Sequence, residues 1–242
     1  VEQASMVLRE SDHLVKMAHQ ARNPFGGEFR LGIIPTVAPY LLPRILPAIR
    51  EQFPDLEIQL TEAQTATITR ELRAGRLDAI LLALPVDEDG VRTVPLYAEP
   101  FYLALSPQHP LCGRNSITAE DLETEEVLLL EDGHCLRDQA LDVCKQAGAV
   151  ENTNFSATSI ETLRHMVSAN IGITLMPELA VEDDSKTIRY LPFEGEPPHR
   201  VIGLVWRTTS TREALLGELA KLLRGLVGAS TALSLENPAG GA

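Results

Sequence analysis

The sequence predicts an α/β fold in which short strands and helices alternate in two successive sets, and three observations support this prediction. The chain has 242 residues, of which 44% are hydrophobic, which is enough for a substantial core in one domain or in two. Short apolar runs bounded by turn residues alternate with longer segments of helical periodicity. No apolar run reaches the roughly 18 residues of a membrane span, so none is expected. Alternation of this kind is typical of a largely parallel sheet covered by helices.

The N-terminal segment, residues 1–22, has the pattern of an amphipathic helix. Its apolar residues recur at spacings of three and four, and charged residues occupy the opposite face. The run Asn23-Pro24-Phe25-Gly26-Gly27 separates this segment from the rest of the chain. We therefore favour a linker or dimerisation helix, and a terminal helix folded onto the domain is the alternative.

The first strand–helix set covers residues 29–84. Strands are expected at 29–34, 56–60 and 78–84, with helices at 41–53 and about 66–74 between them. Pro39, Pro43 and Pro47 fall near or inside the first of these helices. Because proline lacks the N–H that a helix needs, we expect a broken start or a kink there.

The second set begins near residue 101. Thr158 and Glu161 have the spacing of a capping box, which predicts a helix from about residue 160. A strand at 200–207 and a leucine-rich helix follow, and residues 229–242 are expected to be disordered. The other strands are expected at 101–105, 127–130, 154–157, 172–176 and 187–191. Two such sets would place several strand-to-helix loops around one crevice, the usual ligand site of open α/β sheets.

Charge and cysteine content restrict the class of protein. The formal net charge is −13, from 34 acidic and 21 basic residues, and no Lys/Arg-rich patch is visible. Nucleic-acid-binding domains usually carry a basic face, so we do not expect this segment to grip DNA or RNA by itself. Three cysteines do not form a disulfide framework, and the polar N-terminus does not resemble a signal peptide. A reducing, cytoplasmic setting is expected.

The two cysteines of the segment 133–144 carry the clearest chemical signal. Cys135 falls in the first turn of a predicted helix, where free backbone N–H groups favour a thiolate. His134 and Arg137 would add positive charge there, whereas Asp132 and Asp138 oppose it. The apolar face of the same helix carries the second cysteine, with Gly148 as a natural stop. That face consists of Leu136, Ala140, Val143, Cys144 and Ala147.

Helix geometry makes this pair a candidate redox switch. Cys144 follows Cys135 by nine positions on the predicted helix, a rise of roughly 13.5 Å. A disulfide needs Cα atoms within about 7 Å, so bonding the two would require the helix to unwind. The alternative is that both cysteines are ordinary small core residues. Metal binding is weaker still, because there is no C-x₂-C pair and only His134 lies close by.

Five segments of the chain resemble the regulatory domain of LysR-type transcriptional regulators. They are GIIPTVAPYLLP (32–43), EAQT (62–65), LEDGHCLRDQA (130–140), ATSIETLR (157–164) and GITLMP (172–177). The resemblance extends from the first helix to about residue 226. Among these regulators, the segment 133–139 with its second cysteine nine residues later is similar to that of the members that sense hydrogen peroxide.

The resemblance implies an α/β fold of two Rossmann-like lobes of the periplasmic-binding-protein type, preceded by a linker helix. By family analogy the linker helix covers residues 1–24, lobe I residues 25–99 and 203–228, and lobe II residues 100–202 with the redox cysteines. The winged helix-turn-helix that binds DNA in this family is expected to be absent from the sequence, which agrees with the missing basic patch. DNA would then be contacted only through that domain.

The resemblance also implies roles for individual residues. Cys135 would attack peroxide and Cys144 would resolve it to a disulfide. The residues expected to bind or activate peroxide are Thr36, Thr65, His134, Arg200 and Gln139. No metal or cofactor is implied, and Cys112 lies outside the redox motif, where we interpret it as structural.

The partners implied are hydrogen peroxide and further copies of the chain, as a dimer or tetramer. RNA polymerase and a glutaredoxin- or thioredoxin-type reductant follow from the same resemblance. Two other functions remain open. In the first, the domain senses a small metabolite through Thr36, Thr65 and Ser159, and the cysteines are passive. In the second, the chain is a thiol peroxidase, although no thioredoxin-like C-x-x-C motif or other enzyme signature is found.

Overall fold

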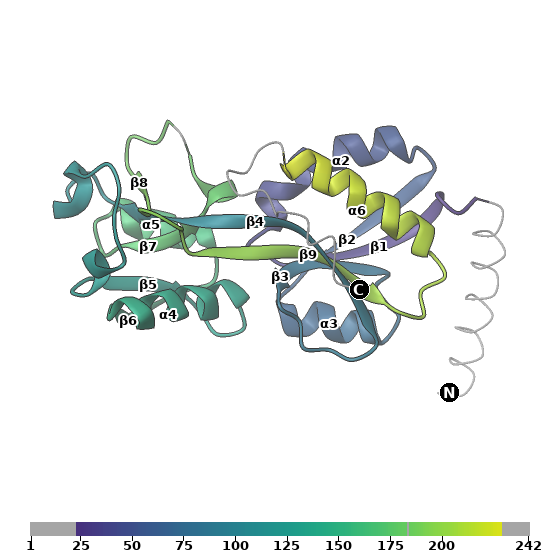
Figure 1. Ribbon diagram of the computed structural model, residues 1–242, viewed down its shortest axis with the longest axis horizontal. Helices are drawn as coiled ribbons and strands as arrows, with labels where there is room; N and C mark the ends of the chain where they lie inside the picture. Colours follow the sequence, from purple (N-terminus) through teal and green to yellow (C-terminus); the bar gives the residue numbers. More distant parts are fainter. Residues whose placement is uncertain (1–22, 183, 229–242) are drawn as a thin grey trace.

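The computed structural model describes residues 23–182 and 184–228 of the chain. Two α/β lobes lie side by side along the long axis of the molecule (Figure 1). Two long antiparallel strands, β4 (Val91–Leu105) and β9 (His199–Arg207), run from one lobe into the other. The expected two-lobed α/β fold is confirmed. The predicted linker helix at 1–24, apart from its last two residues, and the tail at 229–242 lie outside the described residues.

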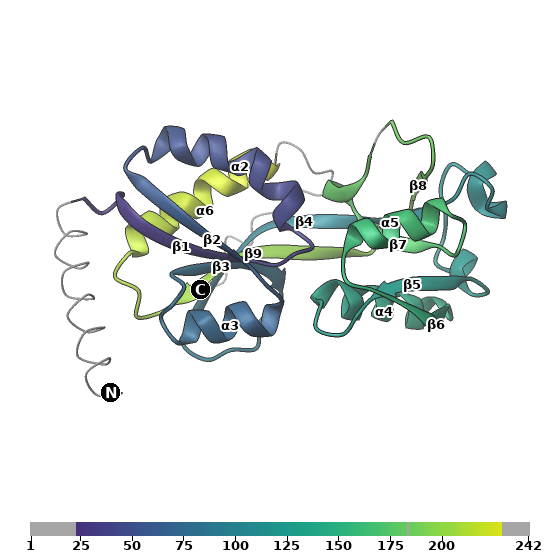
Figure 2. The same ribbon diagram turned by 180° about the vertical axis from the view of Figure 1, so that it is seen from behind.

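Lobe I is built on a sheet with the strand order β2-β1-β3-β9-β4. The first three strands, β1 (Gly27–Ile33), β2 (Leu56–Glu62) and β3 (Ala79–Leu84), are parallel. Helices α2 (Ala38–Gln52) and α6 (Glu213–Gly228) cover one face of this sheet, and α3 (Thr65–Arg73) covers the other (Figures 1 and 2). The buried side chains between these layers form the first hydrophobic core.

Lobe II surrounds the far half of β4. Strands β7 (Thr174–Pro177) and β8 (Arg189–Pro192) pair with β4 antiparallel, and β5 (Glu126–Leu130) pairs with β6 (Val150–Ala157) in a separate parallel sheet. Helices α4 (Cys135–Ala147) and α5 (Ile160–Ser168) pack on these strands around a second hydrophobic core. Three short 3₁₀ turns complete the lobe: η1 (Pro110–Gly113), η2 (Glu120–Leu122) and η3 (Glu178–Ala180).

The sheet is mixed, whereas the sequence predicted a largely parallel one. Strand β9 runs antiparallel to both β3 and β4. Strand β4 carries the chain from lobe I into lobe II, and β9 carries it back. Strand β4 begins at Val91, ten residues before the predicted strand at 101–105. Its first half contains exposed residues and a bulge between Pro95 and Tyr97, so it lacks a clean alternating pattern.

The start of one helix and the capping residue of another differ from the prediction. Helix α2 begins at Ala38 and continues through Pro43 and Pro47 to Gln52, because Leu41, Ile45 and Ile49 anchor one face of it in the core. Helix α5 is capped by Ser159, whose hydroxyl accepts a hydrogen bond from the Thr162 N–H at 3.2 Å; Thr158 is therefore not the cap. Among the described residues, no helix combines the length and apolarity needed to cross a membrane.

Candidate redox site between the lobes

Cys135 is the first residue of α4 and lies at the junction of the lobes. It follows the extended N-cap residue His134 and Gly133, whose φ of +94° suits glycine. A Cβ on Gly133 would lie 2.8 Å from the Gln64 side-chain oxygen, so the loop approaches the start of α3 closely. Cys135 belongs to lobe II in sequence, yet its half-buried side chain packs against the core of lobe I. The thiol therefore lies at the contact between the two lobes.

The Cys135 side chain lines a cavity of about 860 Å³ between α3 and the start of α4. Thr65 and Thr69 contribute to its wall from α3, and Gly133 and Asp138 contribute from the α4 side. Arg73 and Glu88 form an ion pair of 3.0 Å within the same wall. The cavity gives a small solute access to the Cys135 thiol from solvent.

A buried ion pair lies beneath this site. Arg200 on β9 donates to Glu99 on β4 at 2.7 Å, to the Thr36 hydroxyl at 3.0 Å and to the Thr36 carbonyl at 3.1 Å. The second oxygen of Glu99 accepts from the backbone N–H of Leu179 at 2.9 Å. Both charged side chains are at most 1% exposed. The pair thus joins β4, β9, η3 and the end of β1 in one rigid unit.

The Arg200 guanidinium and Cys135 lie within range of each other's charge. Burial alone lowers the pKa of Arg200, but the charges of Glu99, Tyr97 and Cys135 raise it above its usual value. No hydrogen bond joins Arg200 to Cys135 among the described residues, so the two interact through charge.

His134 and Arg137 were expected to add positive charge beside Cys135, with nearby carboxylates opposing it, and the surroundings of both residues reduce that charge. Burial lowers the pKa of His134, and Glu131 at 4.0 Å opposes that shift only in part, so the imidazole is neutral at pH 7. The Arg137 guanidinium is held by the Leu130 carbonyl and by two carboxylates, those of Asp132 and Glu151, each at 2.8 Å. His134 can act only as a neutral hydrogen-bonding group.

The structure divides the predicted peroxide residues between two sides of the loop. Thr65 lines the cavity of Cys135, and its hydroxyl is buried without a hydrogen-bond partner in the described part of the chain. The side-chain amide oxygen of Gln139, one helical turn after Cys135, is likewise buried without a hydrogen-bond partner in the described part of the chain. His134 instead lines a second cavity of about 340 Å³ with Tyr40, Gln64 and Ser159. Thr36 is buried, and its hydroxyl accepts a hydrogen bond from Arg200.

Cys144 is buried on the inner face of α4, in the core of lobe II. Burial raises its pKa to about 11, and the charge of Glu151 acts in the same direction. Helix α4 runs without interruption from Cys135 to Ala147 and stops at Gly148, which adopts the left-handed conformation with φ 74°. All three cysteines of the chain are free. The intact helix keeps the two thiols roughly 13.5 Å apart along its axis.

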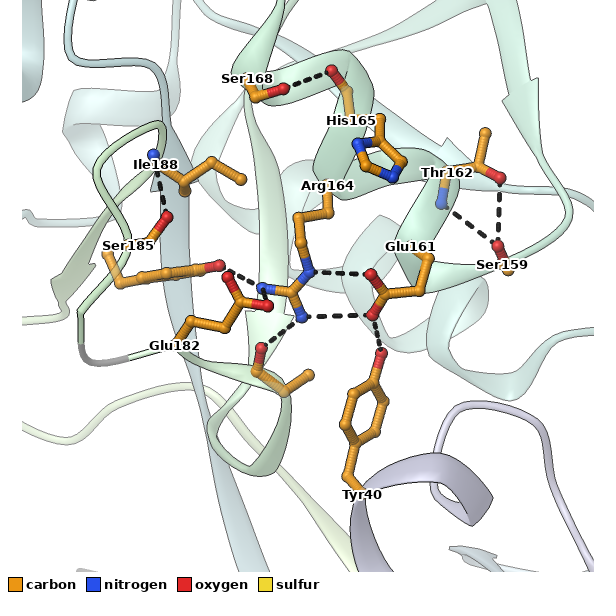
Figure 3. A network of polar contacts seen from close by, with 12 residues as sticks. Tyr40, Ser159, Glu161, Thr162, Arg164, His165, Ser168, Glu182, Ser185 and Ile188 are labelled. Carbon is orange, nitrogen blue, oxygen red and sulfur yellow. Dashed lines mark hydrogen bonds and ion pairs between the residues drawn. The ribbon is translucent and has the colours of Figure 1, made fainter.

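A second polar network joins the lobes on the other side of the cleft (Figure 3). The Tyr40 hydroxyl on α2 donates to Glu161 on α5 at 2.9 Å. Glu161 accepts in turn from Arg164, which also donates to the Ala180 carbonyl at 2.6 Å. Tyr40 packs against the cores of both lobes, so this network fixes their relative position. Glu182 and Tyr190 complete the surroundings of Arg164.

Among the described residues, no group of three or more His, Cys, Asp or Glu side chains is arranged to hold a metal ion.

Comparison with known proteins assigns this arrangement to a family. Residues 22–227 match the family model described as the LysR substrate binding domain. The chain belongs to this LysR family. It is 46% identical over 226 residues to the DNA-binding transcriptional dual regulator OxyR of Escherichia coli, and the match covers 93% of this chain and 74% of that protein. Within the LysR family, the chain falls in the OxyR group of transcription regulators.

Solved structures of OxyR have the same two-lobed fold. The reduced form is 43% identical with a TM-score of 0.78, and the oxidized form is 46% identical with the same score. Each match covers 85% of this chain and 98% of the solved one. The lobes of this LysR-family domain are therefore those of the OxyR regulatory domain.

Two groups that organise the LysR-family site were missed by sequence reasoning. Glu99 stands alone as an acidic residue within the apolar run from Leu96 to Leu105, and a buried charge in such a run signals a buried partner. The predicted strand begins at residue 101, so Glu99 was left outside it and was not recognised as a buried charge. Tyr40 lies in the proline-containing helix α2. No local pattern indicates that it contacts Glu161, 121 residues away.

The Cys144 thiol is expected to resist alkylation in the native chain below pH 9.0. Its folded-state pKa of about 11 lies above the ordinary value of 9.0, so this contribution to stability is fully present below pH 9.0 and is lost as the pH rises through about 11. Iodoacetamide labelling followed by mass spectrometry should mark Cys135 and spare Cys144. Urea unfolding of a Cys144→Ala variant should lack part of the alkaline loss of stability. Equal labelling of both thiols below pH 9.0 would show that α4 is already open.

A Tyr40→Phe substitution is expected to lower the free energy of unfolding by about 1 kcal/mol, because it removes one hydrogen bond to a partly exposed carboxylate and leaves the ring in place. Urea denaturation measures this change. Ser168→Ala on the same helix as Glu161 removes an exposed hydrogen bond to His165 and is the control, with an expected change within about 0.5 kcal/mol. A Tyr40→Phe effect no larger than that of the control would show that the bond does not hold the lobes together.

Proposed function

We propose that this chain is the peroxide-sensing regulatory domain of a LysR-type transcription factor and that it switches by forming a Cys135–Cys144 disulfide. One observation carries the proposal. A half-exposed thiol at a helix N-terminus and a buried thiol on the inner face share the uninterrupted helix α4. Lobe I would comprise residues 25–99 and 203–228, and lobe II residues 100–202. The relatives' names, hydrogen peroxide-inducible genes activator among them, support the choice of oxidant.

The first step is oxidation of Cys135. The thiolate attacks one peroxide oxygen, a sulfur–oxygen bond forms and the oxygen–oxygen bond breaks. The products are a sulfenic acid on Cys135 and hydroxide, which takes up a proton to become water. In this proposal Arg200 favours the thiolate, and the hydroxyls of Thr36 and Thr65 orient the peroxide. His134, as a neutral ring, and Gln139 contribute hydrogen bonds from the loop and from the next helical turn.

The second step is formation of the disulfide. Cys144 has to leave the core of lobe II, so α4 unwinds, and its thiol displaces water from the sulfenic acid. Closing a ring of about ten residues stabilises the oxidised chain by about 2.7 kcal/mol in the chain-entropy model. Losing the burial of one or two apolar side chains costs about 1.5–3 kcal/mol each. Because these quantities are similar, the two states can be close in free energy, as a reversible switch requires.

The output of the switch is a change in how copies of the chain pack together. Unwinding of α4 would change the surface of lobe II and so alter the contacts in a dimer or tetramer. Through the linker helix, this change would alter the spacing of the DNA-binding domains of this family. We propose that RNA polymerase responds to that change. A glutaredoxin- or thioredoxin-type reductant would return the disulfide to two thiols, and the cytoplasm supplies such reductants.

Two rival functions predict different responses. A metabolite sensor would use the cavity of about 340 Å³ beside His134, and its Cys135→Ser variant would still respond to the inducer. A thiol peroxidase would consume many equivalents of peroxide in the presence of a reductant, whereas a sensor reacts once for each reduction. We propose a sensor, not an enzyme.

Free-thiol titration tests the proposal. One equivalent of peroxide should lower the count from three thiols to one, because Cys112 does not take part. Cys112→Ser should still lose two thiols, and Cys135→Ser should lose none. Retention of all three thiols in the native chain, or an equal loss in the Cys135→Ser variant, would refute it.

A further inference from the structure

Helix α3 places two threonines in the wall of the Cys135 cavity. Thr65 opens the helix, and Thr69 follows one turn later on the same side. The other inward-facing residues of this helix, Ile68 and Leu72, are apolar and fully buried. Thr69 itself is 7% exposed, so its hydroxyl lies in a position where an apolar side chain would pack equally well.

Both hydroxyls lack a hydrogen-bond partner. Among residues 23–182 and 184–228, neither the Thr65 nor the Thr69 oxygen makes a hydrogen bond, and each oxygen is buried, so presenting either hydroxyl to a solute in the cavity requires a rotation about its Cα–Cβ bond. An unpaired buried hydroxyl lowers the stability of a fold relative to an isosteric valine. Packing therefore does not account for Thr69, and a role toward a solute in the cavity does.

The character of the cavity indicates which solute fits. Thr65 and Thr69 offer uncharged groups that both donate and accept hydrogen bonds. The same wall carries three acidic side chains, those of Asp87, Glu88 and Asp138, and two basic ones, those of Arg70 and Arg73, so its charges nearly cancel and an uncharged solute fits. Hydrogen peroxide is neutral, and each of its oxygens also donates and accepts. Two hydroxyls about 6 Å apart along a helix face can hold such a molecule between them.

We propose that Thr69 is a peroxide-positioning residue, which together with Thr65 holds the incoming molecule in the cavity and delivers it to Cys135. This inference rests on the proposed peroxide-sensing function and adds a residue to it. Sequence reasoning missed Thr69 because a threonine inside a helix carries no signal until its neighbours are known. Thr69 acts on the approach of peroxide and not on the thiolate itself.

Four variants of the full chain test this role. Thr69→Val keeps the shape of the side chain and removes the hydroxyl, and Thr69→Ser keeps the hydroxyl. Thr67→Val makes the same chemical change at a half-buried position of the same helix that is outside the cavity wall. Thr69→Ala removes the hydroxyl without a branched side chain and replaces Thr69→Val if that variant does not fold.

Two rates are measured for each variant: oxidation of Cys135 by hydrogen peroxide, and its alkylation by iodoacetamide. Removing one neutral hydrogen bond to the approaching peroxide should slow oxidation about tenfold in Thr69→Val and leave alkylation unchanged. Thr69→Ser should recover oxidation to within about threefold of the native rate. Thr67→Val should match the native chain in both reactions.

Two results would overturn the inference. Oxidation of Thr69→Val at the native rate would refute it. Parallel slowing of oxidation and alkylation would assign Thr69 a packing role only. Absence of Cys135 oxidation in the native chain would instead refute the proposed function, so the two failures are distinguishable.

Discussion

A Cys144→Ala variant is expected to react with peroxide at the native rate but to accumulate a sulfenic acid on Cys135 in place of a disulfide. Cys135 lies at the cavity between the lobes, whereas Cys144 is buried in lobe II and is separated from it by an intact helix. The first chemical step therefore proceeds without the second thiol. Trapping with a dimedone-type reagent, followed by intact-protein mass spectrometry, measures how much sulfenic acid accumulates.

The matched control is Cys112→Ala. Cys112 is half-buried in η1 at the far side of lobe II, so this variant should still form the disulfide and should give no trapped sulfenic acid after the reaction is complete. A Cys144→Ala chain that still forms an internal disulfide would identify Cys112 as the resolving thiol. A chain that no longer reacts with peroxide would show that Cys144 is needed for the first step.

A Glu99→Ala substitution is expected to lower the free energy of unfolding by about 3–5 kcal/mol, because it leaves the Arg200 charge buried without its carboxylate. It also removes the acceptor for the Leu179 N–H. Urea denaturation measures the loss. The exposed ion pair between Glu218 and Lys221 is the control, and Glu218→Ala should change stability by at most about 1 kcal/mol.

A double variant separates the stabilising role of this pair from its chemical role. Glu99→Leu combined with Arg200→Met removes both charges, so the double variant should regain most of the stability lost by Glu99→Ala. It should nevertheless oxidise Cys135 more slowly, because the cation near the thiol is gone. A double variant that oxidises at the native rate would show that Arg200 serves the fold alone.

Local sequence patterns were sufficient to predict the parts of the site that lie on one helix. The start of α4 after Gly133, the inward face of Cys144 and the stop at Gly148 follow from helical periodicity and cap preferences, and the structure agrees with each. The spacing of the cysteines along an intact helix followed from the same pattern. These features depend on residues within 15 positions of one another.

Features that depend on distant contacts could not be predicted in this way. Glu99 and Arg200 are 101 residues apart, and Thr36 lies 164 residues before Arg200. Neighbours in sequence indicated that His134 and Arg137 add positive charge at Cys135, and the family resemblance added Arg200. Burial keeps His134 neutral and carboxylates hold Arg137. Only the fold shows that Arg200 is buried against Glu99 and Thr36, within range of the Cys135 charge.

A non-reducing peptide map of the native chain after one equivalent of hydrogen peroxide tests the central claim most directly. The proposed switch predicts one new cross-linked pair of peptides, with Cys135 joined to Cys144, and an unmodified Cys112. Limited proteolysis of the chain under native conditions should also cleave faster between the two cysteines, because α4 has unwound. A map without the Cys135–Cys144 linkage, or with that linkage and an intact α4, would contradict the account.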